Sequence, residues 1–163
     1  MQFTSNHDEN SWSGSEIERM GEAHKAFAVL IYTLDGIPLT YSGQEEPMPK
    51  RLEFFEKDDI GFKDFAYSDF YKKLNTLKHD NSALWNGKYG GSIKRIMKDE
   101  NVFAFRREKN GNKVTIIINL SKQKQTPMTD TDISGTELFT GKKVNLPENS
   151  LCTLFPWEFL VIT

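Results

Sequence analysis

The sequence has almost no cysteine and almost no excess of either charge, and each absence excludes a class of protein. Cys152 is the only cysteine, so no internal disulfide can form, and no Cys and His residues have zinc-ligand spacing. Lys and Arg number 21 against 23 Asp and Glu, interspersed along the chain, for a formal net charge of -2. Without a basic stripe to follow phosphates, nucleic acid is not an expected partner.

Long apolar runs are also absent. No stretch approaches the roughly 20 residues that span a bilayer, so no membrane partner is expected. The start, Met1 to Thr4, lacks a charged region followed by an apolar segment, as a signal peptide would have. A signal peptide lying further upstream would not be visible in this sequence, and localisation therefore stays open.

What is present suits a packed globular protein. The 163 residues are 37% hydrophobic and 12% aromatic, with twelve Phe. That length fits one ordinary domain, or a small domain joined to part of a larger one.

The first forty residues predict a strand, a helix and a second strand. Phe3 to Ser5 is β-prone and leads into the polar segment from Asn6 to Gly14. Ser13 and Glu16 fit a capping box, and a helix is expected over Ser15 to Leu34. Its apolar face would carry Ile17, Met20, Ala23, Phe27, Leu30, Ile31 and Leu34.

After Asp35-Gly36 ends that helix, Ile37 to Ser42 reads as a buried strand. A strand-helix-strand unit implies a parallel sheet with a helical crossover. Polar residues at the carboxyl ends of such strands are placed as ligand contacts, and both Asn6-His7-Asp8 and Tyr41 to Glu45 occupy that position.

The remainder divides into a loop, a helix and an all-β module. Residues 45–64 are predicted as a long loop, followed by a helix over Tyr67 to His79 capped by Ser68 and ending near Asn81. Strands are expected at Val102 to Arg106, Val114 to Leu120, Glu137 to Phe139, Val144 to Leu146, Leu151 to Phe155 and Phe159 to Ile162.

Asn110-Gly111 is a hairpin signal, since both residues tolerate positive φ. The lengths and turn spacing of these strands favour an antiparallel sandwich. Turn chemistry at Asn86-Gly87 and Gly90-Gly91 puts the domain boundary near residues 86–92, giving domains 1–90 and 91–163.

Several side chains have both a structural and a functional interpretation. Taken alone, Asn6-His7-Asp8 is typical of a turn in which Asp8 caps a helix and His7 is packed or solvated. Trp12 could present its face to a glucose ring or cover the start of the first helix.

The segment holding Lys50, Arg51, Phe54 and Phe55 is interpreted as a packed loop with a solvated basic edge, with outer sugar subsites as the alternative. His24 and His79 are expected on helix surfaces, and Trp157 in the core.

Two motifs in the expected order carry a family resemblance. The segment Phe3-Thr4-Ser5-Asn6-His7-Asp8-Glu9 resembles the end of the seventh barrel strand in the α-amylase family. One helix later, Gly36 to Glu45 is similar to the eighth strand of that family and its following loop. Further similarity covers Lys50 to Phe55, Phe70 to Leu74, Asn81 to Leu84 and Pro156 to Phe159, which is nearly the whole chain.

The resemblance implies an α/β fold fragment plus an all-β domain: the last strand-helix-strand-helix of a TIM (β/α)8 barrel, followed by an antiparallel Greek-key β-sandwich. It implies a retaining glycoside hydrolase that cleaves α-glucosidic bonds in starch-like glucans. Asp8 would be the transition-state stabiliser, and His7, Asn6, Trp12 and Tyr41 would bind substrate. Gln44 could shape the sugar site, whereas Glu45 is expected to anchor its loop.

By the same resemblance, the nucleophile and the acid/base should lie upstream of Phe3, so the chain alone is expected to be inactive. Asp64, in a segment superficially like the nucleophile motif, lies after the eighth strand and is interpreted as ordinary loop. Calcium, common in the family, would be held by the missing region, and we expect no cofactor and no metal in this chain.

Two barrel strands without neighbours would expose sheet edges and the apolar face of the first helix. We therefore expect either self-association or a rearranged amino-terminal half packed on itself. The competing function is a non-enzymatic carbohydrate-binding or interaction module built on the sandwich.

Overall fold

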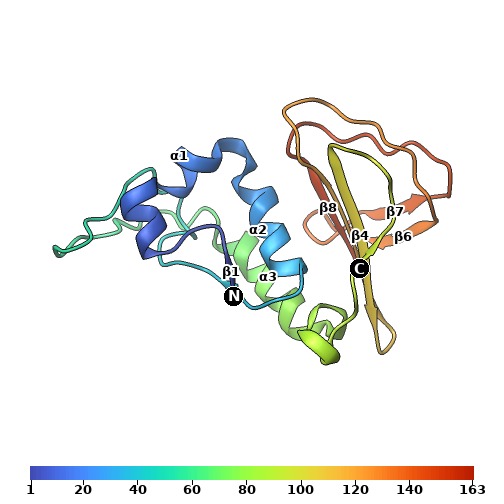
Figure 1. Cartoon of the computed structure of the whole chain (residues 1–163), viewed down its shortest axis with the longest axis horizontal. Coiled ribbons are helices and arrows are strands. Elements are labelled where there is room, and N and C mark those ends of the chain that lie inside the picture. Colours follow the sequence, from blue (N-terminus) through green and yellow to red (C-terminus); the bar gives the residue numbers. More distant parts are fainter.

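A four-stranded antiparallel sheet separates the helices from a two-stranded hairpin in the computed structural model, which describes residues 1–163 (Figure 1). The α-helices are α1 (Glu16–Met20), α2 (His24–Thr33) and α3 (Ser68–Asp80), and the short helical turns are η1 (Glu9–Ser13), η2 (Gly21–Ala23), η3 (Ser82–Leu84) and η4 (Gly87–Tyr89). The strands are β1 (Gln2–Phe3), β2 (Pro38–Leu39), β3 (Lys94–Arg95), β4 (Val102–Lys109), β5 (Asn112–Asn119), β6 (Ile133–Thr136), β7 (Lys143–Leu146) and β8 (Phe159–Ile162). None of the helices has the length and apolar character to cross a membrane.

The two amino-terminal strands pair in parallel, as the strand-helix-strand pattern predicts. Gln2 lies opposite Pro38, and Phe3 lies opposite Leu39. Each strand is only two residues long, shorter than the expected strand over Ile37 to Ser42. Neither strand has a second neighbour, so the outer edge of each is unpaired.

The predicted helix over Ser15 to Leu34 is broken into three pieces. Gly21 adopts φ 51° and ψ -128°, a conformation that ends α1 before α2 begins. The capping box also differs from the prediction: it joins Ser15 and Glu18 rather than Ser13 and Glu16. Glu16 instead turns inward, where its carboxylate accepts a hydrogen bond from Gln44.

Helix α2 is buried on more than one side, so its buried residues are not confined to the predicted apolar face. The sheet and α3 both pack on it, and Ala26, Ala28 and Val29 are fully buried beside Leu30 and Ile31. Phe27, expected on the buried face, is 37% exposed.

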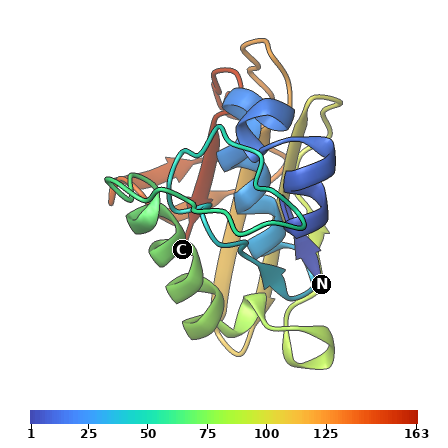
Figure 2. The ribbon, with the colours of Figure 1, turned by 90° about the vertical axis from the view of Figure 1, so that its left-hand side faces the viewer.

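The expectation that this helix leaves its apolar face bare is therefore wrong. The carboxyl-terminal half of the same chain covers it (Figure 2).

Helix α3 spans Ser68–Asp80, close to the predicted range. Tyr71, Leu74 and Leu77 form its buried stripe, as its three- and four-residue spacing requires. Ser68 makes no capping hydrogen bond, so that detail of the prediction is wrong. Asn81 ends the helix and accepts a hydrogen bond from the backbone of Ala83.

The four-stranded sheet has the order β3-β4-β5-β8, and its central strands β4 and β5 are buried on both faces. Along β5, Val114, Ile116 and Ile118 face the helices, whereas Ile117 faces β6 and β7. Side chains alternate between faces of a strand, so a run of three consecutive Ile is what a doubly covered strand requires. The β4–β5 hairpin turns at Asn110-Gly111 with positive φ at both residues, as predicted.

The remaining strand predictions hold in part. Phe159–Ile162 forms β8 as expected, and Lys143–Leu146 contains the predicted Val144 to Leu146. The segments Glu137 to Phe139 and Leu151 to Phe155 do not form strands. They contribute only isolated bridges, which join Glu137 to Ile162, Leu151 to Met128 and Leu154 to Gln125. The short strands β3 and β6 were not predicted. Trp157, expected in the core, is half-buried with φ 58°.

Residues 86–92, where the domain boundary is predicted, are tightly packed against their surroundings, and we call this region the joint. Arg107, on β4, is 1% exposed although it is a charged side chain. Its guanidinium donates hydrogen bonds of 2.8–3.4 Å to the backbone carbonyls of Thr33, Leu34, Leu84, Trp85 and Gly91. Burial lowers the pKa of Arg107, and nearby Asp35 opposes that shift.

Gly90 and Gly91 are part of the same joint. A Cβ on Gly90 would lie 1.7 Å from the Trp85 carbonyl oxygen, and one on Gly91 would lie 2.4 Å from that of Glu108. These glycines permit close backbone contact rather than flexibility.

The mixed organisation, with a parallel α/β part and antiparallel sheets, is confirmed.

Candidate functional site

The triplet Asn6-His7-Asp8 lies where β1 leads into η1. The Asn6 side-chain oxygen accepts a hydrogen bond of 2.8 Å from the Glu9 backbone, and the Asn6 carbonyl accepts one of 2.9 Å from Asn10. Asn6 therefore caps this turn. Asp8, to which the structural interpretation gave that role, makes no capping hydrogen bond.

The side chains of His7 and Asp8 face solvent together. His7 Nε2 lies 3.6 Å from Asp8 Oδ1, and the two side chains are 67% and 60% exposed. The His7 ring also stacks on Phe54, with centroids 5.8 Å apart and planes at 25°. The imidazole is thus held between the Asp8 carboxylate and a distant loop, and both polar groups stay open to a ligand.

That loop, residues 50–59, is bound to η1 by three hydrogen bonds. Asn10 Nδ2 donates to the Lys50 carbonyl at 3.3 Å, and Asn10 Oδ1 accepts from the Leu52 backbone at 2.7 Å. Ser11 Oγ donates to the Leu52 carbonyl at 2.7 Å. Asn10 is 2% exposed, so its amide is committed to this contact.

The base of the loop is closed by Asp58. Its carboxylate pairs with Lys50 and accepts hydrogen bonds from the backbones of Glu53 and Asp59. The hydrogen bond from Lys50 is the main cause that holds the pKa of Asp58 below its usual range.

Trp12 stands on η1 against the tip of the loop. Its ring centroid lies 5.2 Å from that of Phe54 and 6.2 Å from that of Phe55. Trp12 is 61% exposed, so much of it is open to solvent.

Tyr41 follows β2, at the carboxyl end of the neighbouring strand, and is half-buried. Its backbone donates to Gln44 Oε1 at 2.6 Å. The cavity it lines with Ser5, Asn10 and Gln44 has about 20 Å³ of free space, room for about one water molecule and far less than a sugar ring. Tyr41 makes no hydrogen bond with His7 or Asp8, so the structure does not join it to that pair.

Gln44 is a buried structural centre. It is 5% exposed, and its amide donates hydrogen bonds to Thr4, Glu16 and Tyr71 at 2.7–3.2 Å. These contacts join the residue after β1 to α1 and α3, which fixes the carboxyl end of β1. Burial, with the Glu16 charge nearby, raises the pKa of Tyr71 far above its usual value, so its hydroxyl stays protonated.

The loop role expected for Glu45 has support in its contacts. The carboxylate accepts a hydrogen bond from the Gly43 backbone at 2.9 Å, and the Glu45 carbonyl accepts one from Tyr67.

The two helix histidines differ from each other. His79 is exposed, as predicted. His24 is 7% exposed: its ring stacks on Tyr67 at 4.9 Å, and Nδ1 donates to the Gly21 carbonyl. The break at Gly21 turns His24 inward, and the assumption of one continuous helix could not show this.

Asn10 is the site residue that the sequence did not reveal. It lies in a polar segment typical of turns, and its partners, Lys50 and Leu52, are forty residues away. No local pattern marks it. No three His, Cys, Asp or Glu side chains gather so that they could hold a metal ion.

No family model matches the chain. Among curated proteins, it is 29% identical to the β/α-amylase of Paenibacillus polymyxa over 99% of this chain and 14% of that protein. It is 31% identical to the cyclomaltodextrinase of Thermoanaerobacter pseudethanolicus over 62% of this chain and 18% of that protein. The chain thus spans only about a seventh to a fifth of the length of these relatives.

Solved structures agree on the fold. A maltogenic α-amylase from Thermotoga neapolitana aligns with all of this chain at a TM-score of 0.77 and 16% identity, over 41% of its own length. AmyP in complex with maltose aligns with 85% of this chain at a TM-score of 0.62 and 16% identity, over 33% of its length.

The resemblance predicted from the two motifs is confirmed: nearly the whole chain is similar to a part of α-amylase-family enzymes. The coverage of these relatives is consistent with a carboxyl-terminal piece.

Proposed function

We propose that this chain forms one wall of the active site of a retaining glycoside hydrolase that cleaves α-glucosidic bonds in starch-like glucans. The parallel pairing of β1 and β2 is the observation that carries the proposal. It puts His7 and Asp8 just beyond the carboxyl end of one strand and Tyr41 just beyond that of its neighbour. In a β/α barrel, active-site groups come from the carboxyl ends of neighbouring strands.

In this proposal, β1 to α3 are the last strand-helix-strand-helix of a (β/α)8 barrel, and the antiparallel sheets are its Greek-key β-sandwich. The full barrel would supply neighbours for the unpaired edges of β1 and β2. Without them, the chain self-associates through those edges, since the helix face is already covered.

Asp8 acts as the transition-state stabiliser. Its carboxylate accepts hydrogen bonds from hydroxyls of the sugar being cleaved, and His7 donates to the same ring. Both side chains are more than half exposed and face solvent together, which leaves them free for a substrate. Such contacts accelerate the reaction only as far as they strengthen with oxocarbenium character.

The chain alone is inactive in this proposal. Glycoside hydrolysis requires two carboxyl groups across the scissile bond, and only Asp8 matches one of the three family carboxyl positions. No cofactor takes part within this chain.

The competing proposal, a carbohydrate-binding module on the β-sandwich, has one observation in its favour. Phe155 is 61% exposed and is the only exposed aromatic side chain of residues 91–163. A single ring is a poor platform for a chain of sugars, so we favour the active-site proposal.

The test uses the protein encoded with the coding sequence upstream of Phe3 included, alongside the 163-residue chain. The longer protein should release reducing sugar from starch, and Asp8→Asn should lower its kcat by about 10²–10³-fold while KM changes less. Asp64→Asn is the control, because Asp64 lies in an exposed loop and should leave the rate unchanged. Starch hydrolysis by the 163-residue chain at an ordinary amylase rate, or an unchanged kcat in Asp8→Asn, would overturn the proposal.

A further inference from the structure

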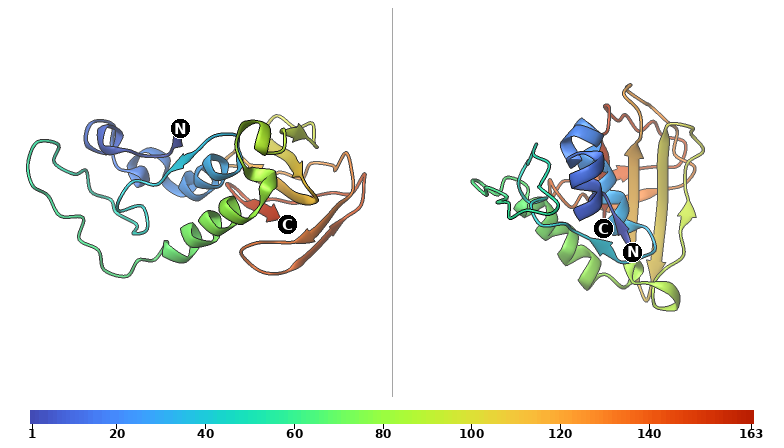
Figure 3. Two further views of the ribbon diagram at one scale, coloured as in Figure 1. Left: turned by 90° about the horizontal axis from the view of Figure 1, so that it is seen from below. Right: turned by 60° about the vertical axis from the view of Figure 1, so that its left-hand side comes forward.

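A hollow of about 630 Å³ opens between α3 and the β6–β7 hairpin (Figure 3). The residues that line it come from α2, α3, the hairpin and the start of β8. Strands β1 and β2, whose unpaired edges the rest of a barrel would cover, contribute no residue to it. The walls of the hollow are therefore built from this chain, and its volume lies within the roughly 300–1,000 Å³ of small-molecule sites.

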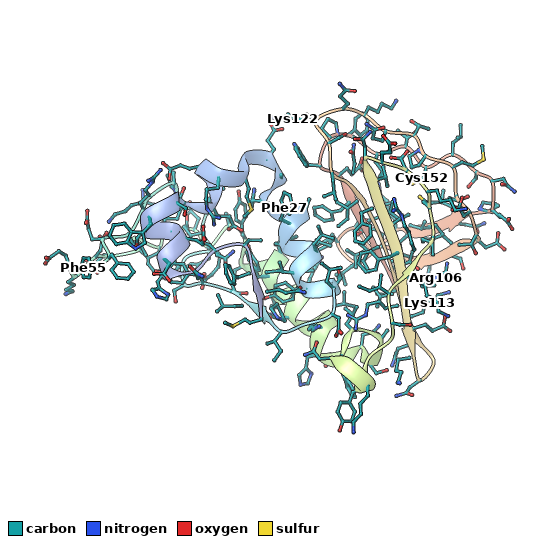
Figure 4. All side chains as sticks on the ribbon, viewed as in Figure 1. Phe27, Phe55, Arg106, Lys113, Lys122 and Cys152 are labelled. Atoms are coloured by element: carbon teal, nitrogen blue, oxygen red, sulfur yellow. The ribbon has the colours of Figure 1, made fainter.

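The hollow is separate from the candidate site. Phe55, on the loop that contacts His7, lies at the end of the molecule furthest from the four-stranded sheet, whereas the hollow lies where the helices meet the sandwich (Figure 4). Neither residues 6–12 nor residues 50–59 line it. A ligand in the hollow would therefore leave His7 and Asp8 open.

Three half-buried aromatic rings form an apolar surface in the hollow. Phe70, on α3, stacks on Phe139, with centroids 5.2 Å apart and planes at 21°. Phe159, on β8, meets Phe139 edge to face at 5.5 Å. The three rings come from different elements and hold one another in place, so they offer a fixed surface to a flat ligand.

Four ammonium groups line the same hollow, and none of them makes an ion pair: those of Lys25, Lys73, Lys142 and Lys143. Lys25 is half-buried, and its Nζ lies 4.2 Å from the centroid of the Tyr67 ring and 5.6 Å from that of Phe70. Lys73 Nζ donates to the Phe139 carbonyl at 2.9 Å. Ring faces and a carbonyl thus position these charges without neutralising them.

The carboxylates of the hollow are mostly engaged by the protein itself. Glu137 is 4% exposed, and its Oε2 accepts hydrogen bonds from two backbone amides and a hydroxyl of the turn that follows it. Glu158 accepts a hydrogen bond of 2.7 Å from the Phe155 backbone. Asp69 is left free, so the lysines outnumber the free carboxylates and the hollow favours an anion.

The kind of cation in the hollow indicates the kind of anion. An ammonium group is a point charge that suits phosphate oxygens, and the planar fork of Arg that pairs with carboxylates is absent from the lining. Several lysines around one hollow suit a ligand with several negative charges, and the rings suit a flat apolar part of the same ligand. A nucleoside polyphosphate has both parts. A compact hollow does not follow the backbone of a nucleic acid as a basic stripe would.

We propose that this hollow binds a nucleoside di- or triphosphate, with the base against the Phe70, Phe139 and Phe159 rings and the phosphates among the lysines. Asp69 accepts a hydrogen bond from a ribose hydroxyl. This site is additional to the glucan site at His7 and Asp8 and does not depend on it.

The experiment titrates the 163-residue chain with ATP, without divalent cations, by isothermal titration calorimetry. We expect a Kd of about 0.1–1 mM. Lys25→Gln and Lys142→Gln should each weaken binding about fivefold, because each removes one charge that faces the phosphates. Lys72→Gln is the matched control, because it removes the same charge from the exposed face of α3 outside the hollow and should leave the Kd unchanged.

Two partial ligands separate the roles of rings and charges. Adenosine carries the base alone and tripolyphosphate carries the charges alone, so each should bind at least about tenfold more weakly than ATP. Equal Kd values for tripolyphosphate and ATP would overturn the proposal, as would undetectable binding of ATP.

The variants and the longer protein supply the remaining outcomes. Thermal unfolding without ligand checks that each variant keeps the fold. Equal losses of affinity in Lys72→Gln and Lys25→Gln would overturn the proposal. So would loss of ATP binding in the protein that includes the upstream coding sequence, since the upstream region would then cover the hollow. None of these results alters the kcat of Asp8→Asn in that longer protein, so failure of this site is distinguishable from failure of the proposed function.

Discussion

The sheet half of the molecule and the site half are built on different principles. Strands β4 and β5 pair over eight residues each and are buried on both faces. Strands β1 and β2 pair over two residues each, and the residues that follow them are held by side-chain hydrogen bonds from Asn6, Asn10 and Gln44. The first half gains stability from burial, whereas the second holds exposed groups in place with polar contacts.

The joint between the halves should give the largest effect. Arg107→Met removes a donor from five backbone carbonyls, of which the Leu84 carbonyl keeps a second hydrogen bond, from Lys78. The free energy of unfolding should fall by about 3–5 kcal/mol, measured by urea denaturation.

Arg106→Met, on the next residue of β4, is the control for Arg107→Met. Arg106 is half-buried and donates to the Thr115 side chain and the Asp132 carbonyl, so its loss should cost about 1 kcal/mol. Equal costs for the two variants would show that the halves are not held together by Arg107.

The close backbone contact at Gly90 should give the next largest effect. A Cβ there would meet the Trp85 carbonyl oxygen at 1.7 Å, so Gly90→Ala must displace backbone. We expect a loss of about 3 kcal/mol by urea denaturation. Gly87→Ala, with φ 55° and open space around its Cβ, should cost only about 1 kcal/mol through strain. The reverse order would show that close backbone contact at Gly90 does not stabilise residues 86–92.

In the site half, Asn10→Ala should loosen the loop without unfolding the sheet. The Leu52 amide loses its acceptor, so its hydrogen exchange should approach that of an unprotected amide. Global stability should fall by about 1 kcal/mol. Ser11→Ala removes only the bond to the Leu52 carbonyl and serves as the control. If β5 amides lost protection together with Leu52, the two halves would unfold as one unit.

The smallest effect is a pH dependence from Lys78. Burial, followed by the nearby Arg107 charge, lowers the pKa of Lys78 to about 8. Between about pH 8 and the ordinary lysine pKa of about 10.4, the unfolded chain binds more protons than the folded one, so stability should rise with pH. Solvent screening of this half-buried group limits the gain to about 1 kcal/mol.

Urea denaturation of the wild type and of Lys78→Gln, at steps between pH 7 and about pH 9.5, measures that difference. The rise should be smaller in Lys78→Gln, and parallel curves would contradict the assignment.

Much of the fold followed from local pattern. The apolar runs of β5 and β8, the turn at Asn110-Gly111 and the stripe of α3 are properties of adjacent residues, so they were predictable. Glu137 to Phe139 has the same kind of pattern, yet it forms only a bridge, because strand formation also depends on which partner lies alongside.

The candidate site also has features that the sequence predicts and features that it does not. Motif and order in the chain were enough to single out His7 and Asp8 and the parallel pairing of the strands that precede them and Tyr41. They could not assign the cap to Asn6 rather than Asp8, since both residue types suit a turn and only backbone geometry chooses between them.

The sequence by itself determined the family resemblance and the types and order of the main elements, because these depend on spacing along the chain. Only the tertiary structure decided that Asn10 binds a loop forty residues away, that Arg107 closes the joint, and that Trp12 meets Phe54 and Phe55 beside Asp8. These contacts join residues that no local period relates, and they form only when the chain folds back on itself.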